Sequence, residues 1–251
     1  VDPDSNYCYG EGGAGTYSIG ISPMVHMAGT PITLTNYETH PIPGQKGRFT
    51  GRPAAWSEGD IPLNMVVAPN SLAVDAKGAR FASETGVAML DPWKAGPKFY
   101  SIWSNDQVQY IKTKGFDYTD KMVAAAFLGY QATLPDKTPM PMIESVLADA
   151  EKAGFVFKAD TIEALAAKIG VTPAALKGTV EAYDGFCKAG VDKQFNKPAE
   201  FLDALGAGPY DAVVGTSFCY STCGALDING SFNVLKADGK TIDWAPPVLS
   251  T

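Results

Sequence analysis

Hydrophobic side chains recur with helical spacing most clearly in two neighbouring segments between residues 160 and 190. The first begins at Asp160, has Glu163 three residues further on as in a capping box, and stops at Gly170. The second opens with Thr172-Pro173 and stops at Gly190. The pattern predicts a helical hairpin with one apolar face on each helix, formed by Ile162, Leu165, Ala166 and Ile169, and by Leu176, Val180, Tyr183 and Cys187.

Short strands and well-marked helices are predicted from residue 71 onwards. The expected elements are a hairpin over 72–81 with its turn at 75–78, a strand over 99–103, a helix capped by Ser104 and Gln107, a helix over 141–152 with Ile143, Val146, Leu147 and Ala150 on one face, and a strand over 155–157. Residues 211–251 return to strand character, and Asp238-Gly239 predicts a hairpin turn there. The mixture predicts an α+β fold.

The first 65 residues are rich in Gly, Pro, Thr and aromatic residues. Ser22-Pro23 and Gly29 can begin and end one short helix. Prolines and glycines between residues 41 and 53 predict an irregular stretch. Gly10 to Gly15 match the spacing of a dinucleotide-binding loop, but neither a buried strand before them nor a helix directly after them is predicted, which favours a plain loop.

Charge and composition exclude several classes of partner. The chain has 251 residues, of which 45% are hydrophobic, and a net charge of −7 with scattered Lys and Arg, so neither nucleic acid nor an acidic membrane surface is expected to bind. No apolar run reaches the roughly 18 residues of a membrane-spanning helix. The four cysteines and two histidines lack zinc-ligand spacing, so we expect free thiols and no metal site. No motif of a hydrolase or a nucleotidase is present.

Three stretches of the chain resemble one enzyme family. Residues 71–84 contain Gly78-Ala-Arg-Phe-Ala-Ser-Glu84, residues 159–198 contain the predicted helical hairpin followed by Asp192-Lys-Gln-Phe-Asn-Lys-Pro198, and residues 208–240 contain Gly224-Ala-Leu-Asp-Ile-Asn229. Together they are similar to the flavoproteins of fumarate reductase and succinate dehydrogenase. The resemblance implies an α+β capping domain, the substrate lid, at 71–213, with a flavin-domain segment at 1–70 and a returning β-hairpin at 214–251.

The resemblance also implies a cofactor and partners. Members of the family bind FAD and reduce or dehydrogenate an activated carbon–carbon double bond of a small molecule. Their N-terminal dinucleotide-binding unit and C-terminal segment find no match here, so we expect a fragment of a longer protein that does not bind FAD tightly without the remainder of its FAD-binding domain. Both a bacterial cytoplasmic and a cell-envelope location stay open.

Several positions depart from the family pattern where substrate and proton would be handled. The proton-donating Arg four residues after Glu84 is replaced by Ala88, and the Glu-x-x-Arg relay falls on Asn64 and Val67. His40-Pro41 matches a His-Pro pair of the family. The resemblance therefore implies His40 and Asn64 as substrate-binding candidates, with an exposed loop histidine as the alternative for His40, and argues against fumarate as the substrate.

A tyrosine stands where the family has a histidine that binds a substrate carboxylate. Tyr220 is followed by Ser221, Thr222 and Gly224, which the resemblance implies as cofactor contacts. A phenol next to a flavin can donate a hydrogen bond or a proton to a carbonyl or enolate oxygen, so Tyr220 is the catalytic candidate. Tyr220 could equally pack under the cap. The function expected is reduction or dehydrogenation beside a carbonyl, and the alternative is a non-catalytic binding module that keeps the cap fold.

Overall fold

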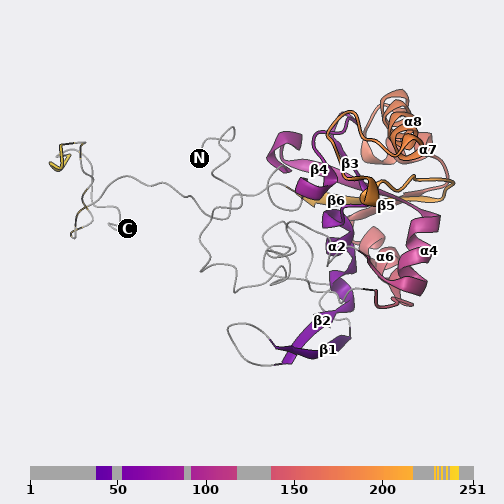
Figure 1. Ribbon diagram of the computed structural model, residues 1–251, viewed down its shortest axis with the longest axis horizontal. Helices are drawn as coiled ribbons and strands as arrows, with labels where there is room; N and C mark the ends of the chain where they lie inside the picture. Colours follow the sequence, from indigo (N-terminus) through magenta and orange to yellow (C-terminus); the bar gives the residue numbers. More distant parts are fainter. Residues whose placement is uncertain are drawn as a thin grey trace.

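A computed structural model describes residues 38–46, 53–87, 92–117 and 137–216, and isolated positions between 229 and 242. These residues form an α+β fold, as predicted from the sequence (Figure 1). In chain order the elements are β1 (Thr39–Lys46), β2 (Pro53–Ser57), α2 (Ile61–Val67), β3 (Leu72–Asp75), α3 (Glu84–Val87), β4 (Lys98–Ser104), α4 (Asn105–Lys114), α6 (Ile143–Lys152), β5 (Val156–Ala159), α7 (Ile162–Ile169), α8 (Pro173–Ala189) and β6 (Tyr210–Thr216).

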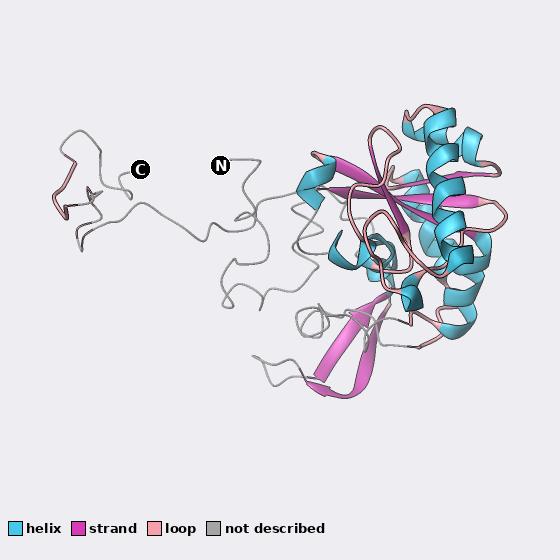
Figure 2. Cartoon of the chain, turned by 45° about the horizontal axis from the view of Figure 1, so that its top comes forward, coloured by secondary structure: helices cyan, strands magenta, loops and turns pink. Residues whose placement is uncertain are grey.

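A four-stranded antiparallel sheet lies at the centre, with the strand order β3-β4-β6-β5. Helices cover both of its faces, as Figure 2 shows. Strand β4 explains why, because its side chains are apolar in both directions: Tyr100 and Ile102 enter one core and Trp103 the other. The sheet is therefore the middle layer of three.

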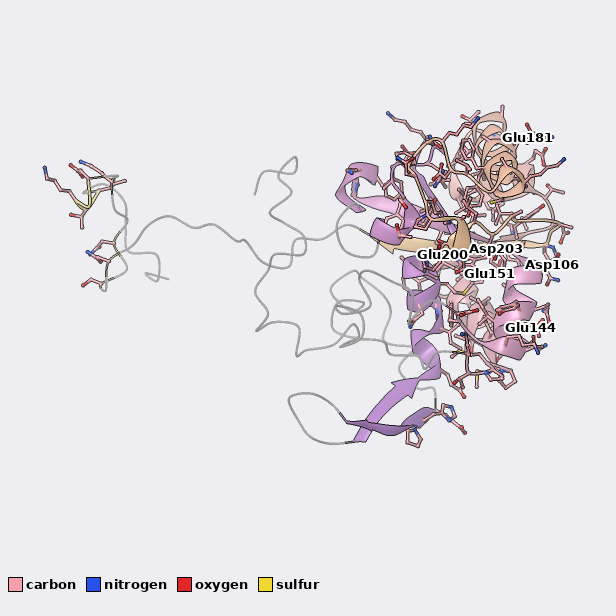
Figure 3. All side chains as sticks on the ribbon, viewed as in Figure 1. Asp106, Glu144, Glu151, Glu181, Glu200 and Asp203 are labelled. Carbon is pink, nitrogen blue, oxygen red and sulfur yellow. The ribbon has the colours of Figure 1, made fainter. Side chains whose placement is uncertain are left out.

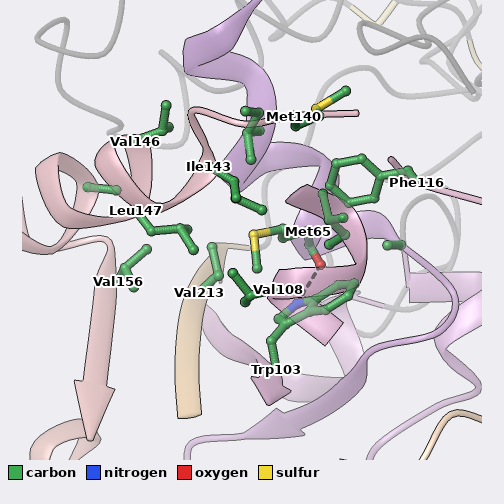
Figure 4. Close-up of a cluster of buried hydrophobic side chains, with 14 of the residues drawn as sticks. Met65, Trp103, Val108, Phe116, Met140, Ile143, Val146, Leu147, Val156 and Val213 are labelled. Carbon is green, nitrogen blue, oxygen red and sulfur yellow. Dashed lines mark hydrogen bonds between the residues drawn. The ribbon is translucent and has the colours of Figure 1, made fainter. Parts of the chain in front are cut away.

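One core lies between the sheet and helices α2, α4 and α6 (Figure 4). Trp103 is fully buried there and its Nε1 donates to the backbone oxygen of Met65 at 3.2 Å, which anchors α2 to β4. The four residues predicted as the apolar face of the 141–152 helix are all buried in this core. The predicted capping box is confirmed, since Ser104 and Gln107 bond each other's backbone N–H at the start of α4.

The second core lies between the opposite face of the sheet and the helical hairpin of α7 and α8. Gly170 and Gly190 end the two helices in the left-handed conformation, as predicted. The cap of α7 was assigned to the wrong residue. Thr161, not Asp160, is the N-cap, and its side chain accepts the N–H of Ala164.

The stretch predicted to be irregular forms a two-stranded hairpin of β1 and β2, so that expectation was wrong. No further strand pairs with it among the described residues, and the register shifts between Pro41 and Lys46. Prolines are tolerated in such a pair because the missing N–H can face away from the partner strand. Helix α2, which was not predicted, follows directly after a turn at Glu58–Asp60.

Several shorter elements predicted from the sequence lie within the described residues, and others lie outside them. The 75–78 turn and the strands at 99–103 and 155–157 are confirmed within one or two residues. Cys187 is free, as predicted. The helix at 22–29, the Gly10 to Gly15 loop and the other three cysteines lie outside the described residues. The three domain boundaries stay predictions.

Acidic side chains are spread over the outer helices. Figure 3 labels Asp106 on α4, Glu144 on α6 and Glu181 on α8, and all three are exposed. The excess of negative charge is thus distributed over the surface of the described part of the chain. Among the described helices, none has the length and hydrophobicity that a bilayer crossing requires.

Candidate functional site

The Gly-x-Arg-Phe-x-x-Glu segment begins in a tight turn after β3. The carboxylate of Asp75 accepts the N–H groups of Lys77 and Ala79, at 2.8 and 2.9 Å. Gly78 adopts a positive φ of 81°, and its carbonyl accepts the hydroxyl of Thr179 on α8 at 2.7 Å. The turn is thereby fixed to the helical hairpin, although the two are about a hundred residues apart in sequence.

Arg80 emerges from this turn into the interior and lies between two carboxylates. Its Nε and Nη2 donate to Glu84 at 2.9 and 2.7 Å, and its Nη1 and Nη2 donate to Asp192 at 3.1 and 2.9 Å. Both pairs are bidentate, the geometry in which a guanidinium binds carboxylates most strongly. The side chains of all three residues are at most 1% exposed, so solvent does not weaken the pairs.

Lys197 is a second buried cation beside the same carboxylate. Its Nζ lies 3.3 Å from Oε2 of Glu84 and donates to the phenol oxygen of Tyr183 at 2.6 Å and to the carbonyl of Ser71 at 2.8 Å. The ring of Tyr183 also lies under Arg80, with 5.1 Å from the guanidinium carbon to the ring centroid. We call Arg80, Glu84, Tyr183, Asp192 and Lys197 the buried charge network.

The pKa shifts in the network follow from burial and pairing. Burial disfavours the charge of Arg80, but the hydrogen bonds to Glu84 and Asp192 outweigh it and raise its pKa. Burial alone would raise the pKa of Asp192, yet the hydrogen bonds from Arg80 and from the backbone N–H groups of residues 194 and 197 hold it well below its usual range. Burial lowers the pKa of Lys197 against the attraction of Glu84, and raises that of Tyr183.

Two cations and two carboxylates make the network neutral when all four are charged, and none of its side chains reaches the surface. Such groups cannot bind a solvent-borne substrate, whereas they can hold backbone segments in place. Arg80 and Glu84 come from the segment after β3, and Asp192 and Lys197 come from the segment after α8. The network therefore holds together, by ion pairs and hydrogen bonds, two segments that are distant in the sequence.

Sequence reasoning quoted these segments but did not assign a role to Asp192 or Lys197. A weak signal was available, because Asp192 follows the predicted helix stop at Gly190 by two residues. Its carboxylate accepts the N–H groups of Gln194, Phe195 and Lys197 and so closes that loop. The partner of such a loop carboxylate cannot be read from sequence, because it lies more than a hundred residues away.

Several curated proteins with similar sequences are named as reductases. The chain is 30% identical over 115 residues to the vinyl phenol reductase of Lactiplantibacillus plantarum, and this match covers 46% of this chain and 23% of that protein. It is 35% identical over 89 residues to the urocanate reductase of Eggerthella lenta, covering 36% and 14%. It is 34% identical over 88 residues to a probable fumarate reductase of Shewanella frigidimarina, covering 35% and 15%. Part of this chain is therefore similar in sequence to several reductases, among them a probable fumarate reductase.

The matched part of the chain spans less than a quarter of each of these three reductases. Among solved structures, it is similar to an open flavocytochrome c3 fumarate reductase, with a TM-score of 0.41 and 22% identity over 82% of this chain and 29% of that one. It is also similar to a fumarate reductase flavoprotein subunit from Lactobacillus plantarum, with a TM-score of 0.39 and 15% identity over 66% of this chain and 93% of that one. No family model matches the sequence.

The positions at which the chain departs from the flavoprotein pattern are only partly described. His40 lies in β1, where its Nε2 is 2.8 Å from Oε1 of Glu58. Asn64 is buried in α2, and α2 contacts α3, the helix that begins at Glu84. Ala88, Tyr220, Ser221, Thr222 and Gly224 lie outside the described residues. The structure therefore places two of the predicted site residues, one in β1 and one in α2.

Proposed function

We propose that this chain forms the substrate-capping region, with adjoining flavin-domain segments, of a longer FAD-dependent oxidoreductase. The reaction is reduction or dehydrogenation of a carbon–carbon bond activated by a neighbouring carbonyl. Its substrate is not fumarate. The whole protein's small-molecule substrate and the remainder of its own FAD-binding domain are the partners that this proposal requires.

The observation that carries the proposal is the buried charge network. The sequence resembles the flavoproteins in separate stretches, and Arg80 of one stretch is bound to Asp192 of another through a bidentate pair. This contact supports the idea that the two stretches belong to one structural unit and that their resemblance to the flavoproteins is not a coincidence of two separate segments. The named activities of the similar proteins, vinyl phenol and urocanate reductases among them, support a reaction at a double bond.

The network also supports a division of roles within the motif. Arg80 and Glu84 use their charged groups on each other and on Asp192, with side chains at most 1% exposed. They are proposed as scaffold, while residues outside the network contact the substrate. FAD, when bound by the whole protein, supplies the hydride acceptor or donor, and Ser221, Thr222 and Gly224 are the residues of this chain proposed to contact it.

Tyr220 is proposed to donate a hydrogen bond or a proton to the carbonyl or enolate oxygen of the substrate. His40 is proposed to contact the substrate, and Asn64 to stand where the family places an ionisable relay group. Neither Ala88 nor Asn64 can carry a proton, and no Arg is left at those positions to bind a carboxylate. This loss favours a less charged substrate than a dicarboxylate.

Replacing Tyr220 tests the proposal in the FAD-containing protein that carries this chain. Tyr220→Phe keeps the ring and removes the proton, so we expect the turnover number with enone substrates to fall by about 10²–10⁴-fold while the flavin spectrum stays unchanged. Tyr110→Phe, at an exposed position of α4, is the matched control and should retain full turnover.

Unchanged turnover in Tyr220→Phe would contradict the catalytic role and favour a tyrosine that packs under the cap. A second outcome bears on the alternative function. If the complete protein binds no FAD, the chain serves as a binding module that keeps the cap fold, which the loss of the family's Arg and His positions also favours.

A further inference from the structure

The β1–β2 hairpin brings one imidazole and two carboxylates together on a single face. Thr39 pairs with Ser57 and His40 with Trp56, and the N–H of Glu58 donates to the carbonyl of Glu38 at 3.1 Å. Glu38 and Glu58 therefore lie directly opposite each other. Side chains two residues apart on a strand share a face, so His40 lies on the same face as Glu38.

The three side chains converge. The potential ligand atoms of Glu38, His40 and Glu58 lie within 4.8 Å of one another, and Nε2 of His40 is 2.8 Å from Glu58. The side chains of His40 and Glu58 are 33% and 12% exposed, and Glu38 is exposed, so the cluster is open to ions from solution. The hairpin lies apart from the four-stranded sheet, as Figure 1 shows.

The charges of the cluster favour a cation between the strands. Two carboxylates placed directly opposite each other on a hairpin repel, at a cost of a few tenths of a kcal/mol or more. A positive ion bound by both would convert this repulsion into attraction. An imidazole nitrogen combined with carboxylate oxygens is a donor set for divalent transition metals, Zn²⁺ in particular, and is less suited to Ca²⁺ or Mg²⁺, which prefer oxygen alone.

We propose that Glu38, His40 and Glu58 form a binding site for a divalent transition metal ion such as Zn²⁺. Each residue supplies one ligand, and water completes the coordination, because a fourth protein ligand is absent from this cluster among the described residues. The expectation from sequence was that no metal site exists. That expectation considered the spacing of cysteines and histidines, whereas this site depends on the pairing of two strands.

Titration calorimetry of the 251-residue chain with Zn²⁺, without FAD or substrate, tests the site. We expect one Zn²⁺ per chain. His40→Ala and Glu58→Gln should each weaken binding by roughly 100-fold, since even the loss of a residue that only supports a ligand costs 10–100-fold. His26→Ala, which removes the other histidine, and Glu163→Gln on α7 are matched controls and should leave affinity unchanged.

Two further arms keep the test decisive. Glu38→Gln changes an exposed side chain, so it should weaken Zn²⁺ binding with no change in the circular dichroism spectrum even if the other variants fold poorly. Co²⁺ in place of Zn²⁺ should give a spectrum without a thiolate charge-transfer band. Absence of binding, binding that survives His40→Ala, or a thiolate band would overturn the proposal, and the last would assign the ion to cysteines.

Discussion

Two groups of charged residues in this chain have similar distances and opposite surroundings. In the buried charge network, Arg80 lies 2.7 Å from Glu84 and both side chains are 1% exposed. In the hairpin, His40 lies 2.8 Å from Glu58 and the imidazole is 33% exposed. Distance alone does not separate them. Burial does, because a buried pair cannot exchange its partners for water or for a ligand, while an exposed pair can.

The comparison indicates a structural role for the first group and supports the ligand contacts proposed for the second. The buried group holds the segment after β3 to the loop after α8. The hairpin group retains access to solvent, and both functional roles proposed for His40, in substrate contact and in metal binding, require that access. Metal binding is measured without FAD, so failure of one role leaves the other standing.

The largest expected effect is the removal of the central cation. Arg80→Ala leaves Glu84 and Asp192 buried without their shared partner, so we expect a loss of about 3–5 kcal/mol in the free energy of unfolding, measured by urea denaturation. Lys152→Ala, which breaks the exposed pair with Asp149, should cost less than about 1 kcal/mol. If the two variants cost the same, the distinction by burial fails.

Asp192 should give an effect that depends on pH. Because its pKa is lowered in the folded state, its stabilising contribution is complete above its usual pKa of about 3.9 and disappears as the pH falls further. Asp192→Asn should therefore cost about 2–4 kcal/mol at pH 7, and much less at about pH 2. Urea denaturation at the two pH values gives the answer, and Asp106→Asn on the surface of α4 is the control. A difference that is independent of pH would contradict the pairing.

Tyr183→Phe should have a moderate effect. The phenol oxygen accepts the 2.6 Å hydrogen bond from Lys197, and its loss leaves a buried ammonium group with fewer acceptors. We expect a cost of about 1–3 kcal/mol in the free energy of unfolding. Tyr110→Phe removes an exposed phenol and should change stability by less than about 0.5 kcal/mol. Equal effects would mean that Lys197 is satisfied without the phenol.

The smallest effect is expected at Asp211, a buried carboxylate outside the network. Its Oδ2 lies 3.3 Å from Lys158, and its Oδ1 has no hydrogen-bond partner among the described residues. Burial raises the pKa of Asp211, because the interior disfavours its ionised form. The contribution of Asp211 to the free energy of unfolding therefore falls as the pH rises and the carboxyl group ionises. Asp211→Asn should change stability at pH 7 by less than about 1 kcal/mol or increase it. A loss of stability as large as that of Asp192→Asn would contradict the conclusion that pairing, and not burial alone, makes a buried carboxylate stabilising.

Local chemistry made much of the fold predictable. Gly170 and Gly190 end helices because glycine adopts a positive φ without strain, and Ser104 with Gln107 satisfies the first N–H groups of α4. The hairpin of β1 and β2 was missed because its prolines argue against strands in general, and only the pairing shows that they are tolerated here.

The candidate site was less predictable, for a physical reason. The role of Arg80 depends on Asp192, and that of His40 depends on Glu38 and Glu58, and only the fold decides which of these groups meet. The resemblance identified His40 and Asn64, which the structure locates in β1 and α2. The roles of Tyr220, Ser221, Thr222 and Gly224 are inferred from the resemblance alone, because these residues lie outside the described part of the chain.

Turnover by the FAD-containing protein with matched substrates tests the central functional claim most directly. Initial rates of flavin reoxidation would be compared for fumarate and for an enone of similar size, under anaerobic conditions. The account predicts rapid reoxidation by the less charged substrate and slow or no reoxidation by fumarate, because the resemblance aligns Ala88, Asn64 and Tyr220 with ionisable groups of the flavoproteins. Reoxidation by fumarate at an equal or higher rate would contradict it.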